Sequence, residues 1–104
     1  MDFLSFADHK PFTARLTIAA DLDPQLPGRV LDRFAERGEL PLRFSSQVDA
    51  SEALRIEVEF DAATACARLL ARRLQNLPTV RSVALTFHHK LMTPHEKSAV
   101  ALSA

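Results

Sequence analysis

The sequence predicts an α+β fold in which a four-stranded antiparallel sheet carries two helices on one face. Four segments alternate apolar and polar side chains with a period of two, which is typical of strands with one buried face. Two segments between them repeat apolar residues at helical spacing, so the order is strand, helix, strand, strand, helix, strand. Because strands with one apolar face need one covering layer, we expect a two-layer sandwich.

The first strand is expected over residues 12–22, where every second side chain from Phe12 to Leu22 is apolar. The first helix is expected to follow two prolines, with Val30, Leu31, Phe34 and Ala35 on its apolar face. A glycine at position 38 can adopt the left-handed conformation that ends many helices.

The second strand is expected over residues 40–45, and its Pro41 suits an edge strand or a strand start because proline has no N–H to donate. Residues 47–53 are expected to form the turn to the third strand, over 54–61, which has the clearest alternation in the chain. Right-handed crossovers then place strands one and three in the centre and strands two and four at the edges.

The second helix is expected over residues 62–77, ending before Pro78, and the fourth strand has Val83, Leu85 and Phe87 facing inward. Residues 12–89 would form the folded domain, with an N-terminal extension over 1–11 and a tail over 90–104. In the tail, Thr93 to Glu96 match a capping box, which favours a short helix, although a frayed terminus is the alternative.

Composition excludes several classes of function. Thirteen basic side chains balance thirteen acidic ones, so a surface that follows nucleic-acid phosphates is not expected. No apolar run approaches a membrane span and the first ten residues lack the pattern of a signal peptide, so we expect a cytoplasmic protein. The single cysteine, Cys66, lies among alanines and leucines and is interpreted as a buried, unreactive thiol.

No arrangement of residues predicts catalysis or a metal site, so we expect a protein that is not an enzyme and has no cofactor. His88 and His89 point to opposite sides of a strand, which prevents them from sharing an ion with each other. Glu57 and Glu59 lie on one strand face and could act as an acid and base pair. Three arginines are expected on that same face, Arg15, Arg43 and Arg55. A cross-strand lattice of opposite charges is therefore the preferred interpretation.

The two prolines before the first helix lead to the candidate site. Only one of Pro24 and Pro27 can occupy the start of a regular helix, so we expect a tight turn over residues 23–26 and a helix that begins at Pro27. The backbone N–H groups of Gly28 and Arg29 would then lack helical acceptors, at the positive end of the helix dipole, where a carboxylate can bind. The equal alternative is that Gly28 lets the helix pack closely on the first strand or on another subunit.

The segment LPGRVLDRFAERG, between two strands, resembles the opening of an ACT domain, the small βαββαβ module with a ferredoxin-like fold that binds amino acids at dimer interfaces. The positions that carry the resemblance are Gln25, Leu26, Pro27, Gly28, Val30, Leu31, Phe34 and Gly38. The segments DPQLPGRVLDRFAERGE and LLARRLQNLPTVRSVAL are similar to the short regulatory subunits of acetolactate synthase. Gln25 stands where ACT sites often carry asparagine or aspartate.

The resemblance implies a regulatory homodimer that binds an amino acid and modulates a catalytic subunit of amino-acid biosynthesis. The ligand-binding residues it implies are Asp23, Gln25, Leu26, Pro27, Gly28 and Arg29 of one subunit, with Phe44, Ser45, Ser46 and Gln47 of the other closing the pocket. A structural adaptor that dimerises and binds a partner protein without a small ligand is the alternative.

Overall fold

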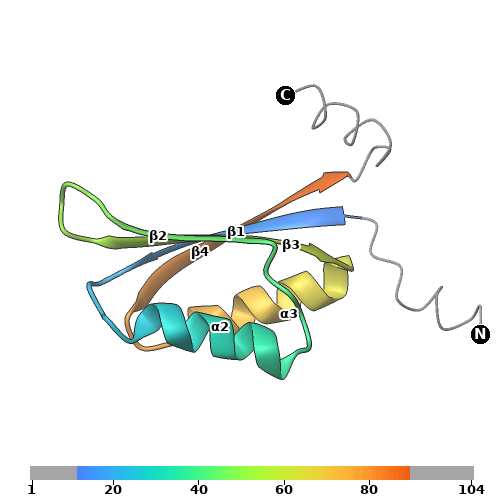
Figure 1. Ribbon diagram of the computed structural model, residues 1–104, viewed down its shortest axis with the longest axis horizontal. Helices are drawn as coiled ribbons and strands as arrows, with labels where there is room; N and C mark the ends of the chain where they lie inside the picture. The colour runs from blue at the N-terminus through green and yellow to red at the C-terminus, as the bar shows by residue number, and fades with distance from the viewer. Residues whose placement is uncertain (1–11, 90–104) are drawn as a thin grey trace, which may run out of the picture.

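The computed structural model describes residues 12–89 and has the predicted order and sheet. Both helices cover one face of the sheet, and the other face is open (Figure 1). The elements are β1 (Phe12–Ala20), α2 (Leu26–Glu36), β2 (Arg43–Val48), β3 (Leu54–Ala62), α3 (Thr64–Gln75) and β4 (Val80–His89). The predictions for the two terminal extensions, including the capping box, lie outside the described residues.

The strand order is β2-β3-β1-β4 and every neighbouring pair is antiparallel. β1 pairs along its whole length with β3 on one side and with β4 on the other. The prediction that strands one and three are central and that strands two and four form the edges is therefore confirmed. One long side of β2 has no partner strand within the described chain.

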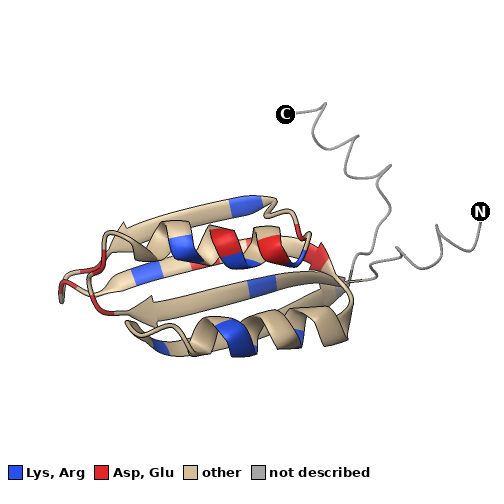
Figure 2. Cartoon of the chain, turned by 90° about the horizontal axis from the view of Figure 1, so that it is seen from below, with Lys and Arg blue, Asp and Glu red and all other residues tan. Residues whose placement is uncertain are grey.

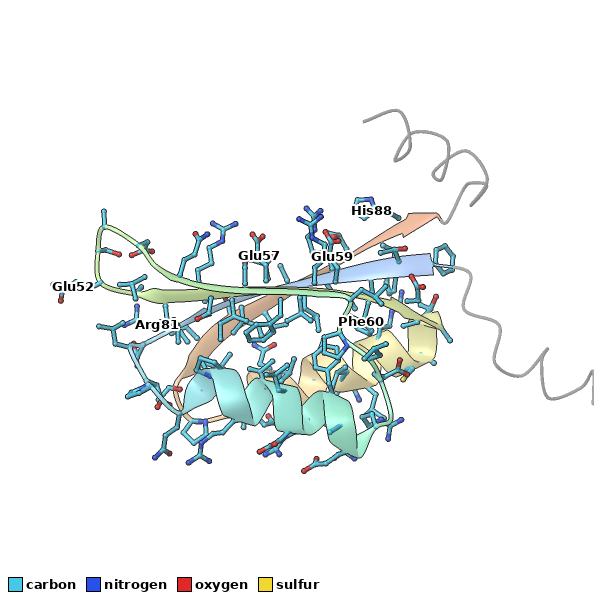
Figure 3. The ribbon with its side chains drawn as sticks, viewed as in Figure 1. Glu52, Glu57, Glu59, Phe60, Arg81 and His88 are labelled. Carbon is cyan, nitrogen blue, oxygen red and sulfur yellow. The ribbon has the colours of Figure 1, made fainter. Side chains whose placement is uncertain are left out.

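The core lies between the sheet and the helices, as the alternation of the strands predicts. Leu16 and Ile18 of β1 are fully buried, as are Val30 and Phe34 of α2. The rings of Phe34 and Phe60 meet edge to face, with centroids 4.8 Å apart and planes at 85°. Phe60 points toward the helices, whereas its strand neighbour Glu59 points to the open face (Figure 3).

The boundaries of β1 and β2 differ from those expected. β1 ends at Ala20 instead of position 22, because the Asp21 N–H leaves the ladder and donates to the Thr79 carbonyl, at 3.0 Å. β2 begins at Arg43 and continues to Val48, so the prediction that residues 47 and 48 belong to the turn is wrong.

The β2–β3 turn is fixed by the side chain of Asp49. Its Oδ1 accepts hydrogen bonds from the backbone N–H groups of Ser51, at 2.9 Å, and Ala53, at 3.0 Å. Glu52 adopts a left-handed conformation, with φ of 63°. The turn therefore occupies five residues that close on one carboxylate, and the strands on both sides extend fully up to it.

The helices begin and end for local reasons. α2 ends in a Schellman motif, in which Glu39 N–H donates to the Phe34 carbonyl and Gly38 N–H donates to the Ala35 carbonyl. Gly38 has φ of +69°, which confirms the predicted left-handed stop. α3 begins at Thr64 and has Ala63 at its N-cap with no side-chain cap; residue 62, expected in the helix, instead ends β3.

The outer faces of the two helices differ in charge (Figure 2). α2 alternates basic and acidic side chains, whereas the charged residues of α3 are all arginines: Arg68, Arg72 and Arg73. All three arginines are exposed. Neither helix of the described chain is long and apolar enough to cross a membrane.

Candidate functional site

The loop between β1 and α2 has the tight turn that the two prolines predict. The Leu26 N–H donates to the Asp23 carbonyl at 3.0 Å. The Asp23 carboxylate holds this turn in place, because its Oδ1 accepts from the Gln25 N–H at 3.0 Å and its Oδ2 accepts from the Thr79 hydroxyl at 2.8 Å. These two hydrogen bonds, with a smaller contribution from the Arg29 charge, lower the pKa of Asp23 below its ordinary value of 3.8.

The start of α2 presents one free backbone donor, not the two that were predicted. The helix begins at Leu26, one residue earlier than expected, and the Arg29 N–H donates to the Gln25 carbonyl at 3.1 Å. The prediction of a free amide at Arg29 is therefore wrong. In the described part of the chain, the Gly28 N–H has no hydrogen-bond acceptor.

Gly28 faces open space. A Cβ placed on it would meet no atom within 4 Å, and the residue is exposed. The alternative that Gly28 allows α2 to pack closely on β1 is therefore wrong for the single chain. The space over Gly28 leaves room for another molecule to approach, either a ligand or a second copy of the chain.

The neighbouring side chains divide into structural and accessible groups. Leu26 is fully buried in the core, and Pro27 is half-buried. The Gln25 side chain lies on the surface, where its Oε1 accepts a hydrogen bond from Arg29 Nη2 at 2.8 Å. A ligand at this helix start would contact Gly28 and the exposed Gln25–Arg29 pair, whereas Leu26 supports them from below.

The four predicted residues of β2 do not share one face of the sheet. Phe44 pairs with Val58 and packs against the core, and Ser46 lies on the same helix-covered side. Ser45 and Gln47 pair with Glu57 and Arg55 and therefore point to the open face. Among the described residues, no hydrogen bond joins these four to the start of α2, so they could close that site only from a second copy.

Exposed apolar side chains lie on and next to α2 and β2. Leu40 is 70% exposed, Val48 60% and Leu42 51%, and Leu22 and Leu31 are also exposed. Val48 is on the sheet face that carries the helices, yet neither helix covers it. This edge therefore combines unpaired strand backbone with apolar surface, two features of an interaction surface.

The open face of the sheet has the predicted lattice of charges. Glu59 Oε2 accepts from Arg15 Nη2 at 2.6 Å and from Arg15 Nε at 3.0 Å, and Glu59 Oε1 lies 4.0 Å from Arg43 Nε. Arg55 Nη2 pairs with Glu57 at 2.9 Å. Sequence reasoning did not predict the depression of about 240 Å³ on this lattice, lined by Arg15, Arg43, Phe44, Ser45, Glu57 and Glu59.

Cys66 and His88 show no sign of reactive chemistry. Cys66 is half-buried instead of buried, and its Sγ–H donates to Glu39 Oε2 at 3.0 Å. Burial first, and then the Glu39 carboxylate, raise the pKa of this thiol, so it stays protonated at neutral pH. His88 is exposed, and residues 12–89 contain no cluster of three His, Cys, Asp or Glu side chains that could hold a metal ion.

Comparisons with known proteins show which solved structures share this fold. No protein-family model and no curated protein sequence matches the chain. Among solved structures, the C-terminal domain of MgtC from Mycobacterium tuberculosis aligns with a TM-score of 0.62 at 11% identity, over 83% of this chain and 97% of that one. The ACT domain of GTP pyrophosphokinase from Chlorobium tepidum aligns with a TM-score of 0.62 at 12% identity, over 73% of this chain and 99% of that one.

An enzyme shares the same architecture. Acylphosphatase from Bacillus subtilis aligns with a TM-score of 0.58 at 11% identity, over 77% of this chain and 88% of that one. At these identities the likeness shows the fold alone, which is ferredoxin-like and ACT-like, and does not point to acetolactate synthase subunits in particular. Because regulatory and catalytic proteins both use this fold, function has to be argued from the site.

Proposed function

We propose that this chain is a non-catalytic regulatory domain that binds an amino acid at a homodimer interface and modulates a partner enzyme of amino-acid biosynthesis. The observation that carries the proposal is the Gly28 amide, which is exposed, has no acceptor in the described chain and opens the first turn of α2. The shared fold with the ACT domain of GTP pyrophosphokinase supports it.

The dimer would form through β2 and the adjoining side of α2. An unpaired edge strand with apolar neighbours tends to associate, and Leu40, Leu42 and Val48 provide such neighbours here. Pairing of two β2 strands about a two-fold axis would bury these side chains and create two equivalent sites. The partner's residues 44–47 would then cover the helix start.

The ligand carboxylate would accept from the Gly28 N–H at the positive end of the α2 dipole, and the Arg29 guanidinium would add positive charge beside it. Arg29 could contribute because its contact with Gln25 is on the surface and can exchange. The ligand ammonium would lie near Asp23. Each Asp23 oxygen has one intramolecular donor, and a carboxylate oxygen can accept a second.

Regulation follows if the ligand contacts one dimer geometry better than another, because only a differential affinity can shift an equilibrium. The partner would be a separate catalytic chain such as that of acetolactate synthase.

The proposal is tested by ligand binding. A thermal-shift screen of the full chain over the twenty amino acids should show a rise in melting temperature for one chemical group, such as the branched-chain residues. A ligand at a hundred times its dissociation constant adds about 2.7 kcal/mol of stability. An extrinsic dye is needed because the chain contains neither Trp nor Tyr.

Calorimetry then locates the binding site. Gly28→Asp places a carboxylate where the ligand carboxylate would bind and should abolish the heat of binding without unfolding the chain. Ala65→Asp is the matched control, because it adds the same group to the first turn of α3, where Ala65 is also exposed. Equal heats for the wild type and Gly28→Asp would contradict the proposal.

A structural adaptor without a small ligand is the second candidate, and the exposed apolar edge favours it independently of Gly28. It predicts dimerisation that Val48→Lys disrupts and that no amino acid changes. Analytical ultracentrifugation separates a dimer from the 11.6 kDa monomer, with and without each amino acid. Unchanged association across the whole set would favour the adaptor.

A further inference from the structure

The open face of the sheet contains a depression whose charged residues the proposed function does not use, although Phe44 and Ser45 also belong to the segment that would cover the partner's helix start. Its volume is about 240 Å³, and its six lining residues come from β1, β2 and β3. Glu57 and Glu59 point away from the helices on this face (Figure 3). The depression is therefore on the opposite side of the sheet from α2 and belongs to a single chain.

The charges around the depression are separated into two rows by the strand register. In one row, Glu59 lies between Arg15 of β1 and Arg43 of β2, so two guanidinium groups flank one carboxylate. In the next row, Glu57 lies between Thr17 and Ser45, and its cation is Arg55 of the same strand, at 2.9 Å. Both side chains of this pair are exposed, so Glu57 can exchange Arg55 for a ligand ammonium group. Residues two apart on a strand are separated by about 7 Å, so a positive row faces a negative row at that spacing.

Arg43 is the least engaged charge of the positive row. Its side chain is 78% exposed, and its one ion pair in the described chain is the 4.0 Å contact with Glu59. That distance is too long for a hydrogen bond, whereas Arg15 contacts the same carboxylate at 2.6 and 3.0 Å. The Arg43 guanidinium can therefore bind a new carboxylate, in the two-pronged geometry typical of arginine, without breaking a strong contact.

We propose that this depression binds a small zwitterion, with the ligand carboxylate on Arg43 and the Ser45 hydroxyl and the ligand ammonium on Glu57. The lining contains two arginines and two glutamates, so its formal charge is zero. A zwitterion can pair its carboxylate with the positive row and its ammonium group with the negative row. A simple anion or cation can pair with only one of the two rows. Phe44 also lines the depression, although its side chain packs against the core on the other side of the sheet.

The experiment is a titration of the full chain followed by backbone-amide NMR, with L-leucine as the probe. Two analogues separate the charges: isocaproate lacks the ammonium group, and isoamylamine lacks the carboxylate. L-leucine should shift the amides of Ser45, Glu57 and Glu59, and each analogue should bind about tenfold more weakly or worse, since each loses a charge-assisted hydrogen bond.

Two variants test the assigned side chains. Arg43→Gln and Glu57→Gln should each weaken L-leucine binding at this face by about tenfold or more. Both residues are on the surface, so the fold should be retained, and an unchanged amide spectrum outside the open face verifies it. Arg72→Gln is the matched control, since it removes an exposed arginine from α3 and should leave binding unchanged.

Three results would overturn the zwitterion site. Equal binding by wild type, Arg43→Gln and Glu57→Gln would show that these side chains hold no ligand. Isocaproate as tight as L-leucine would show a simple anion site. Shifts confined to residues 21–29 and lost in Gly28→Asp would place the amino acid at the start of α2, which supports the proposed function while refuting the open-face site.

Discussion

Replacing Gly28 with alanine is expected to stabilise the fold and to weaken amino-acid binding at the same time. Gly28 has a helical conformation within α2, and an added Cβ would meet no atom within 4 Å. Alanine in a helix is about 0.5–1 kcal/mol more stable than glycine because the unfolded chain has less freedom to lose. The same methyl group would lie at the surface that a ligand carboxylate has to approach.

The chain provides its own control, because it contains two glycines. Gly38 has φ of +69° in the Schellman motif that ends α2, where an alanine is strained. Gly38→Ala should therefore destabilise the fold by about 1–2 kcal/mol. Both substitutions replace glycine with alanine, yet the structure predicts that one raises the stability of the fold and the other lowers it.

Thermal denaturation followed by far-UV circular dichroism measures the effect of each substitution on stability. Gly28→Ala should raise the melting temperature by about 4 °C, and Gly38→Ala should lower it by a similar amount or more. Destabilisation by Gly28→Ala would show that the space over Gly28 is filled in solution. Increased stability with undiminished amino-acid affinity would remove Gly28 from the binding site.

Three further predictions concern stability. Ala63→Asp should raise the free energy of unfolding by about 1 kcal/mol, because the uncapped start of α3 gains a hydrogen-bond acceptor. An unchanged melting curve would refute this prediction. Arg68→Glu should raise the free energy of unfolding by about 0.5 kcal/mol, because the like-charge pair that Arg68 forms with Arg72, four residues on, becomes an attractive pair. This gain in stability should shrink in high salt. The pKa values of Asp23 and Asp49 are lowered in the fold, so the ionised carboxylates stabilise it above their ordinary value of 3.8, and stability is lost as the pH falls through the folded-state values. Asp23→Asn should flatten this acid dependence, which denaturation at a series of pH values measures, and an unaltered profile would contradict it.

The faces of the sheet could be predicted from sequence because alternation leaves little freedom. In β3, Ile56, Val58 and Phe60 must face the core if any one of them does, and Glu57 and Glu59 must then face the open side. The cross-strand charge lattice followed from the same register. The hollow within it did not, since it depends on how the side chains pair.

The start of α2 could be predicted only in part. Gln25 has helical angles, with φ of −90° and ψ of −13°, and this turns its carbonyl toward the Arg29 N–H. A shift of one residue in the helix start was therefore enough to remove one of the two predicted free donors. The Asp23 and Asp49 side chains also fixed turns through contacts that no periodicity reveals.

The central claim is that the Gly28 amide is a free donor that binds an amino-acid carboxylate. The most direct test follows the Gly28 backbone amide resonance during titration with branched-chain amino acids. We predict that the Gly28 resonance moves downfield to saturation while that of Arg29, which is already hydrogen-bonded, moves much less. A Gly28 resonance that stays in place while a ligand binds elsewhere, or while no ligand binds, would contradict the account.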